Sequence, residues 1–88
     1  MPVDKAIESE SIAFNNSNPV EANFEAKCKA FYVKTSANVY IAFDRPANTA
    51  DFLLEAADRV VQLQPVEATK VSALGASGSG TLYIIGTR

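Results

Sequence analysis

Apolar and polar residues alternate in short stretches along most of this 88-residue chain. The clearest stretch is Val39–Phe43, where Val39, Ile41 and Phe43 share one side and Tyr40 and Ala42 share the other. A two-residue period bounded by turn-forming residues is typical of β-strands. The same pattern predicts strands at residues 11–14, 20–25 and 26–34.

Residues 26–34 are apolar on both sides of the predicted strand. Alternation places Cys28, Ala30 and Tyr32 on one face, and Phe31 and Val33 on the other together with two lysines. A strand of this kind is expected in the centre of a sheet, or with one face covered by a partner.

The end of the chain, residues 70–88, reads KVSALGASGSGTLYIIGTR and predicts two more strands. Serine and glycine alternate at residues 77–80, between an alternating stretch and the mainly apolar residues 81–85. This arrangement predicts a β-hairpin closed by a glycine-serine turn. A phosphate-binding loop is disfavoured because such loops precede a helix, whereas a strand is expected here.

Residues 50–64 fit two patterns equally well. Phe52, Leu53, Ala56, Ala57 and Val60 would form a helical stripe, but residues 59–64 alternate as in a strand and contain two β-branched residues. The strand interpretation gives a strand at 51–54, a turn at 55–58 and a strand at 59–64, followed by a connector at 66–69. It brings the total to seven or eight short strands, which suits an all-β sandwich or barrel.

The size and composition favour one small domain with a thin core. Residues 1–8 are polar and are expected to form an N-terminal arm, and residues 9–88 a single β-sandwich domain. At this length the core is marginal, and Cys28, the single cysteine, cannot form an internal disulfide. Oligomerisation or docking on a partner is therefore expected to supplement the core.

Charge and composition argue against several function classes. The net charge is −2 and no basic patch is evident, so nucleic acid and anionic membranes are not expected partners. No stretch has the length of a signal peptide or a membrane span, so synthesis in a cytoplasm is expected. There is no histidine, and the acidic residues at 44–58 lack the spacing of a calcium loop. An enzyme is not expected, nor is a metal or cofactor site.

The three tyrosines, Tyr32, Tyr40 and Tyr83, are the candidate binding residues. Tyrosine is frequent at the rim of sheets and at protein interfaces, with its ring covered and its hydroxyl hydrated. A stacking platform for sugars remains the alternative interpretation.

Two segments resemble a known family. NVYIAFD at residues 38–44 and LGASGSGTLYIIG at residues 74–86 are similar to segments of small virion accessory proteins of tailed bacteriophages, of the capsid decoration (cement) type. Shorter matches occur in the same order at residues 30–33, 52–54 and 71–74. The resemblance favours strands within residues 50–64, and it implies a jelly-roll-like antiparallel β-sandwich without catalytic residues.

The resemblance also implies a function. The chain is expected to bind the outer surface of a phage capsid, to bridge subunits of the major capsid protein, and to form a homo-oligomer, either a trimer or a dimer. Expected contact residues are Pro2, Val3 and Ile7 of the arm, with Tyr40, Arg45 and Tyr83. The alternative is a tail or head-fibre accessory protein, or a β module that binds a carbohydrate or receptor.

Overall fold

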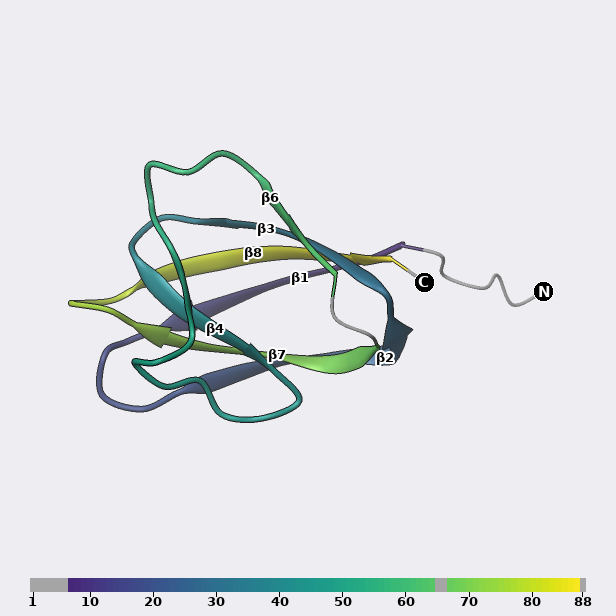
Figure 1. The fold of residues 1–88 in the computed structure, drawn as a ribbon, viewed down its shortest axis with the longest axis horizontal. Helices are drawn as coiled ribbons and strands as arrows, with labels where there is room; N and C mark the ends of the chain where they lie inside the picture. Colours follow the sequence, from purple (N-terminus) through teal and green to yellow (C-terminus); the bar gives the residue numbers. More distant parts are fainter. Residues whose placement is uncertain (1–6, 65–66, 88) are drawn as a thin grey trace.

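Two antiparallel four-stranded sheets face each other across a hydrophobic core in the computed structural model, which describes residues 7–64 and 67–87 (Figure 1). Strands β1, β8, β3 and β6 form one sheet, and strands β2, β7, β4 and β5 form the other. In chain order the strands are β1 (Ile7–Phe14), β2 (Val20–Cys28), β3 (Ala30–Thr35), β4 (Val39–Phe43), β5 (Phe52–Leu54), β6 (Val61–Leu63), β7 (Ala68–Gly75) and β8 (Gly80–Thr87). The all-β prediction is thus confirmed.

The strand pairing is that of a jelly roll. The first strand pairs with the last, β2 with β7, β3 with β6 and β4 with β5, and both sheets are completed by the pairs β3–β8 and β4–β7. A long antiparallel ribbon that is rolled up produces this order, and eight strands in two sheets are characteristic of the architecture. The jelly-roll-like sandwich implied by the family resemblance is therefore what the chain forms.

The two ends of the sandwich differ. One end, here called the terminal end, holds the start of β1, the end of β8 and the bend between β2 and β3, since Thr87 is paired with both Ile7 and Ala30. The opposite end, called the loop end, holds the connections at residues 15–19, 36–38, 55–60 and 76–79. Every strand therefore runs between these two ends.

Inward-facing residues of both sheets build the core. Leu82 and Ile84 of β8 and Val33 of β3 face Val39 and Val71 of the other sheet, and all are at most 1% exposed. Three phenylalanines join the sheets: the ring of Phe31 lies 5.2 Å from those of Phe24 and Phe43, centroid to centroid. The rings of Phe24 and Phe31 meet edge to face, and those of Phe31 and Phe43 are tilted. Aromatic contacts of this kind add to the stabilisation from buried area. The core thus follows the alternation in the sequence.

The predicted terminal hairpin is wrong. Strands β7 and β8 lie in different sheets, and residues 76–79 cross between them instead of closing a two-strand ladder. Backbone donors at the crossing bond to other loops: the N–H of Gly75 donates to the Asn15 carbonyl at 2.7 Å, and that of Ala76 to the Asn38 carbonyl at 3.0 Å. Local alternation identified both strands, but their partners lie far away along the chain.

The single strand predicted at residues 26–34 is also wrong. The chain bends at Lys29, so β2 ends in one sheet and β3 begins in the other. Cys28 points into the core, whereas Tyr32 points outwards, so they do not share a face. Cys28 is buried because the stretch changes sheet, whereas Tyr32 lies on the outer face of β3. The central-strand interpretation therefore does not hold for the stretch as a whole.

The boundaries of the other strands differ from the predicted ones by a few residues. β1 begins at Ile7, two residues inside the predicted arm, and residues 1–6 lie outside the described part of the chain. The strands within 50–64 are present but shorter, and the turn between them is closed by the Asp58 N–H, which donates to the Glu55 carbonyl at 2.9 Å. β7 begins at Ala68, within the predicted connector.

One edge of the sandwich is bridged by an acidic side chain. Glu8 of β1 reaches across to the other sheet, where its carboxylate accepts a hydrogen bond from the backbone N–H of Glu25 in β2 (Oε2, 3.1 Å). β2 is irregular here, because its pairing with β7 shifts register between Asn23 and Cys28. The carboxylate thus supplies an acceptor at this irregular stretch of the edge.

Candidate binding surface

The outward side of the β1-β8-β3-β6 sheet carries an apolar surface. In the described part of the chain, four of the five exposed large hydrophobic side chains lie there, and they line one groove: Tyr32 (37% exposed), Val60 (58%), Tyr83 (52%) and Ile85 (42%). We call these four residues the outer-face patch. The fifth, Phe52, lies on β5 of the other sheet.

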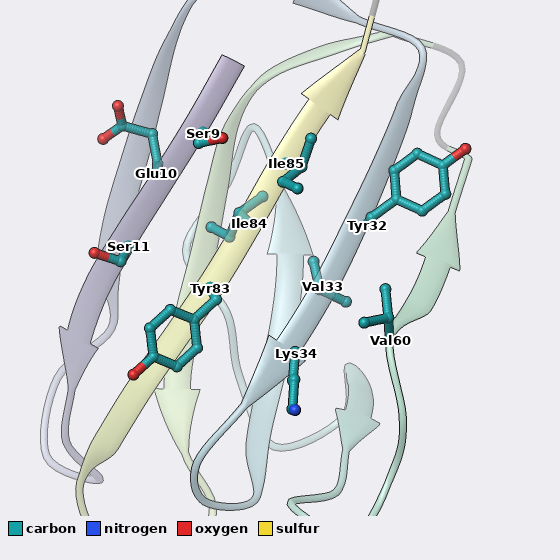
Figure 2. A pocket seen from close by; sticks show the side chains of 10 residues that line it. All are labelled: Ser9, Glu10, Ser11, Tyr32, Val33, Lys34, Val60, Tyr83, Ile84 and Ile85. Atoms are coloured by element: carbon teal, nitrogen blue, oxygen red, sulfur yellow. The ribbon is translucent and has the colours of Figure 1, made fainter. Parts of the chain in front are cut away.

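Strand register sets the positions within the patch. On β8, Ile85 lies between Ser9 of β1 and Tyr32 of β3, and Tyr83 lies between Ser11 and Lys34. Val60 is contributed by the segment that leads into β6 (Figure 2). The side chains surround an open groove of about 410 Å³, whose floor is the backbone of β8 and β3 at Ile84 and Val33. A rigid two-strand base therefore fixes the spacing of the two tyrosines.

The patch arises because two strands are apolar on both faces. Leu82 and Ile84 of β8 fill the core, but the alternate positions hold Tyr83 and Ile85, where an exposed sheet face would usually carry polar residues. β3 repeats the pattern with Val33 inside and Tyr32 outside. This apolar content is not needed for the core, so it points to a contact with another molecule.

Polar groups frame the groove on two sides. The hydroxyl residues Ser9 and Ser11 lie on the β1 side, and Lys34 lies beside Tyr83 on β3. Glu10 also lines the groove, but its carboxylate points away from Tyr83, beyond β1 (Figure 2). Lys34 is therefore the charged group that accompanies the aromatic rings. An apolar centre with a polar margin is the composition of a protein contact surface or of a site for an amphipathic ligand.

The groove is lined by several kinds of side chain. Its side chains are aromatic, aliphatic, hydroxyl, carboxylate and ammonium groups. Within residues 7–64 and 67–87, no three histidine, cysteine, aspartate or glutamate side chains come together in a way that could hold a metal ion. Cys28 is buried at 2% exposure, far from solvent.

The expected contact residues are dispersed over the structure. Tyr83 belongs to the outer-face patch, whereas Tyr40 is half-buried on the outer face of the opposite sheet, between Leu53 and Leu74. Ile7 starts β1 at the terminal end, and its backbone pairs with Thr87. Pro2 and Val3 lie outside the described residues. The structure therefore brings Tyr83 together with Tyr32, which was a candidate binding residue but not an expected capsid contact. It adds Val60 and Ile85, which sequence reasoning did not select.

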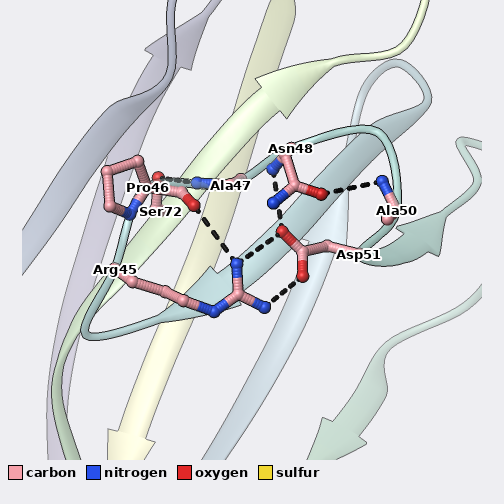
Figure 3. A network of polar contacts seen from close by, with 7 residues as sticks. All are labelled: Arg45, Pro46, Ala47, Asn48, Ala50, Asp51 and Ser72. Atoms are coloured by element: carbon pink, nitrogen blue, oxygen red, sulfur yellow. Dashed lines mark hydrogen bonds and ion pairs between the residues drawn. The ribbon is translucent and has the colours of Figure 1, made fainter.

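Arg45 lies in the connection between β4 and β5 and is engaged within the chain. Its guanidinium donates to both carboxylate oxygens of Asp51 and to the carbonyl of Pro46 (Figure 3). These hydrogen bonds lower the pKa of Asp51, as does the backbone N–H of Asn48, and the same pair raises the pKa of Arg45. Arg45 is thus held in one orientation, with its side chain 54% exposed.

Two further contacts fasten the same connection to the sheet. The N–H of Ala47 donates to the hydroxyl oxygen of the fully buried Ser72 at 2.9 Å. Asp44, in the left-handed region at φ 56°, accepts hydrogen bonds through Oδ1 from the backbone N–H groups of Thr69 (3.1 Å) and Lys70 (3.0 Å). Aspartate tolerates this conformation better than most residues. The connection therefore leaves the terminal end and lies back over β7.

Neither a model of a known protein family nor a curated protein sequence matches the chain. Among the described residues there is no helix long and apolar enough to cross a membrane.

Proposed function

We propose that this chain is a structural virion protein of a tailed phage, which binds the outer surface of the capsid and stabilises it by bridging major capsid subunits. The observation that carries the proposal is the outer-face patch on a small jelly-roll sandwich. Jelly rolls are frequent in viral capsid proteins, although lectins and cupins share the architecture. The resemblance of residues 38–44 and 74–86 to decoration proteins adds support.

The mechanism is adhesion by repeated weak contacts. The two tyrosines of the patch together expose about 180 Å², if each has about 200 Å² in total. Complete burial of that area would contribute about 4 kcal/mol before the costs of association. One such contact is weak, but several contacts with the same lattice raise the effective concentration of each remaining one. Low affinity of each single contact is therefore sufficient for stable attachment of a protein that is present in many copies.

Bridging also sets a requirement for valence. A unit that joins two capsid subunits must make at least two separate contacts with the shell. The terminal end offers a second surface, since β1 starts there and the connection that presents Arg45 leaves from it. The expected partners are accordingly the major capsid protein and further copies of this chain, in the virion.

Co-sedimentation tests the proposal. Purified chain is mixed at micromolar concentration with undecorated capsids of the phage that encodes it, and the pelleted fraction is measured. We expect saturable binding and a higher temperature of capsid disruption. A double variant, Tyr83→Ser with Ile85→Thr, is expected to bind at least tenfold more weakly, because two central apolar groups are lost.

Phe52→Ser provides the matched control for that experiment. Phe52 is exposed to 48%, similar to Tyr83, but it lies on the other sheet. This variant is expected to bind as the unaltered chain does. Absence of any pelleted protein, or equal loss in both variants, would reject the proposal.

The groove favours one second candidate, a β module that binds a carbohydrate or receptor, as on a tail or head fibre. The groove has a volume of about 410 Å³, which is within the range of small-ligand sites. Its two tyrosine rings could stack on the apolar face of a sugar ring, and the neighbouring serine hydroxyl groups could bond to the sugar hydroxyls. Titration with a panel of oligosaccharides, followed by NMR shifts of the Tyr32 and Tyr83 ring protons, distinguishes it. Saturable shifts without capsid binding would favour this second function.

A further inference from the structure

We propose that the outer-face patch joins two copies of this chain face to face, about a two-fold axis that runs parallel to the strands. The dimer itself does not depend on the proposed function, although its use as a bridge on a capsid does. The axis lies in the interface, between β8 and β3, so that β8 of each copy faces β3 of the other.

Strand register makes the patch self-complementary under this operation. Two rows cross the sheet: Ser9, Ile85, Tyr32 and Gln62 form the first, and Ser11, Tyr83 and Lys34 form the second. The two-fold axis sets each row against itself in reverse order. Each residue of a row therefore faces a residue of a different chemical type in the second copy.

The second row supplies the electrostatic match. Tyr83 of one copy meets Lys34 of the second, and the symmetry repeats this pair. An ammonium group over a tyrosine ring is attracted by the negative ring face, and more strongly once water is removed. Tyr83 is the more exposed tyrosine of the patch, and it would enter the groove of the second copy beside Lys34 and Val60. The groove of each copy is thus occupied by Tyr83 from the same surface of the other copy.

The first row supplies an apolar centre and a polar margin. Ile85 meets Tyr32 of the second copy, twice by symmetry, while Ser9 meets Gln62 at each side. Aromatic and aliphatic groups at the centre, with hydrogen-bonding groups at the rim, match the usual anatomy of protein interfaces. Aligned packing of two sheets is also the common arrangement of sandwich layers.

The size of the surface predicts weak association. Four strands about 4.8 Å apart, and six residues rising about 3.3 Å each, give a face of about 19 by 20 Å. Counted on both copies, this is about 800 Å² before side-chain relief is added, below the roughly 1,000 Å² of a stable specific interface and in the range of weak, transient contacts. We therefore expect a dissociation constant on the order of 10–100 µM. A lattice that concentrates the chain would favour the dimer further.

The direction of the axis gives the dimer a use. Rotation about an axis parallel to the strands leaves strand direction unchanged, so the terminal ends of both copies point the same way. Two equivalent ends then face one surface. On a capsid, such a dimer contacts two neighbouring subunits at once through its two terminal ends. The patch then serves bridging by forming the dimer, and not by direct contact with the shell.

Sedimentation velocity from about 5 µM to about 0.5 mM tests the dimer, since this range spans the expected dissociation constant. The average mass is expected to rise towards twice that of the monomer. Tyr83→Ser and Lys34→Ser are each expected to weaken the dimer at least tenfold, while Phe52→Ser leaves it unchanged. Tyr83 and Lys34 are not in the core, so both variants should unfold at the same denaturant concentration as the unaltered chain.

Cross-linking tests the axis. A chain with Ser9→Cys and a chain with Gln62→Cys are mixed and treated with a bis-maleimide that spans about 10 Å, the distance between packed sheets. A linked heterodimer is expected, and little product from Ser9→Cys alone. An axis across the strands would set Ser9 against Ser11 instead, and Ser9→Cys mixed with Ser11→Cys would then link. Buried Cys28 should not react, as the unaltered chain will show.

The outcomes separate the two proposals. A monomer at all concentrations, or a dimer that Tyr83→Ser leaves intact, overturns the two-fold contact. If that monomer still binds capsids through the patch, its occupant is the capsid protein, and only the decoration function survives. A patch-dependent dimer that never binds capsids retains the contact and rejects decoration.

Discussion

Gly75 ends β7 at a point where the chain has no room for a side chain. A Cβ atom at this position would lie 2.1 Å from the carbonyl oxygen of Gly78 and 3.0 Å from the backbone of Asn15. Both neighbours are backbone, so neither can rotate away. To reach even 3.0 Å, the shortest separation that real Cβ atoms show, the crossing at 76–79 would have to move by about 0.9 Å. Gly75→Ala is therefore expected to displace the connection between the two sheets.

The magnitude follows from two contributions. The shift would break or lengthen the 2.7 Å hydrogen bond from the Gly75 N–H to the Asn15 carbonyl, a loss of about 1–2 kcal/mol for a buried donor. Overpacking against backbone adds about 1–3 kcal/mol. We expect a total destabilisation of about 3 kcal/mol, a large fraction of the roughly 4–13 kcal/mol available to a domain of this length. The midpoint of thermal unfolding should fall by more than about 10 °C.

Gly78→Ala is the matched control, because a Cβ at Gly78 has no neighbour within 4 Å. It is expected to be neutral or to stabilise by up to about 1 kcal/mol, through a less flexible unfolded chain. Urea unfolding followed by circular dichroism at neutral pH measures both variants. A Gly75→Ala variant within about 0.5 kcal/mol of the unaltered chain would refute the steric reasoning.

Three further changes test the packing and the polar network. Ser72→Ala removes the acceptor of the Ala47 N–H in a buried site, and urea unfolding should show a loss of about 1–3 kcal/mol; no change would mean that water replaces the hydroxyl. Leu82→Ala, at a fully buried position, should cost about 2–5 kcal/mol in the same assay, and a smaller loss would indicate that the core collapses around it. The lowered pKa of Asp51 means that its pairing with Arg45 stabilises the fold above the ordinary pKa of 3.8, and that this contribution disappears as the pH falls through the lower folded value. The difference in unfolding midpoint between the unaltered chain and Asp51→Asn should accordingly be present at neutral pH and shrink as the pH falls below 3.8; a constant difference would contradict the pairing.

Alternation along the sequence predicted which stretches are strands, because inward and outward positions alternate wherever one face is buried. It predicted Val39–Phe43 closely. It did not predict pairing, since hydrogen bonds between strands leave no local trace in the residue pattern. The stretch around Cys28 and Tyr32 shows the limit: a corner between sheets and a central strand both produce residues that are apolar on two sides.

The candidate surface was partly visible in the sequence. Tyr83 and Ile85 alternate with two core residues, so their outward direction follows directly from the strand period. Tyr32 was grouped with Tyr83 as a candidate but was assigned to the face of Cys28, and that assignment is wrong. Val60 could not be placed because it precedes a strand of three residues, and only the fold brings that segment to the groove. The contact between Ala47 and Ser72, 25 residues apart, likewise carries no sequence signal.

The Glu8 carboxylate that spans the β1–β2 edge has a consequence for crowding. β1 is an edge strand of eight residues, and an exposed edge strand can pair with a strand of another molecule. At high protein concentration, such pairing can lead to fibrils. Here an incoming strand would meet a negative charge that is already committed to the Glu25 N–H, next to a second acid at Glu10. Many copies can therefore crowd together through their sheet faces while the β1–β2 edge of each copy resists strand pairing with another.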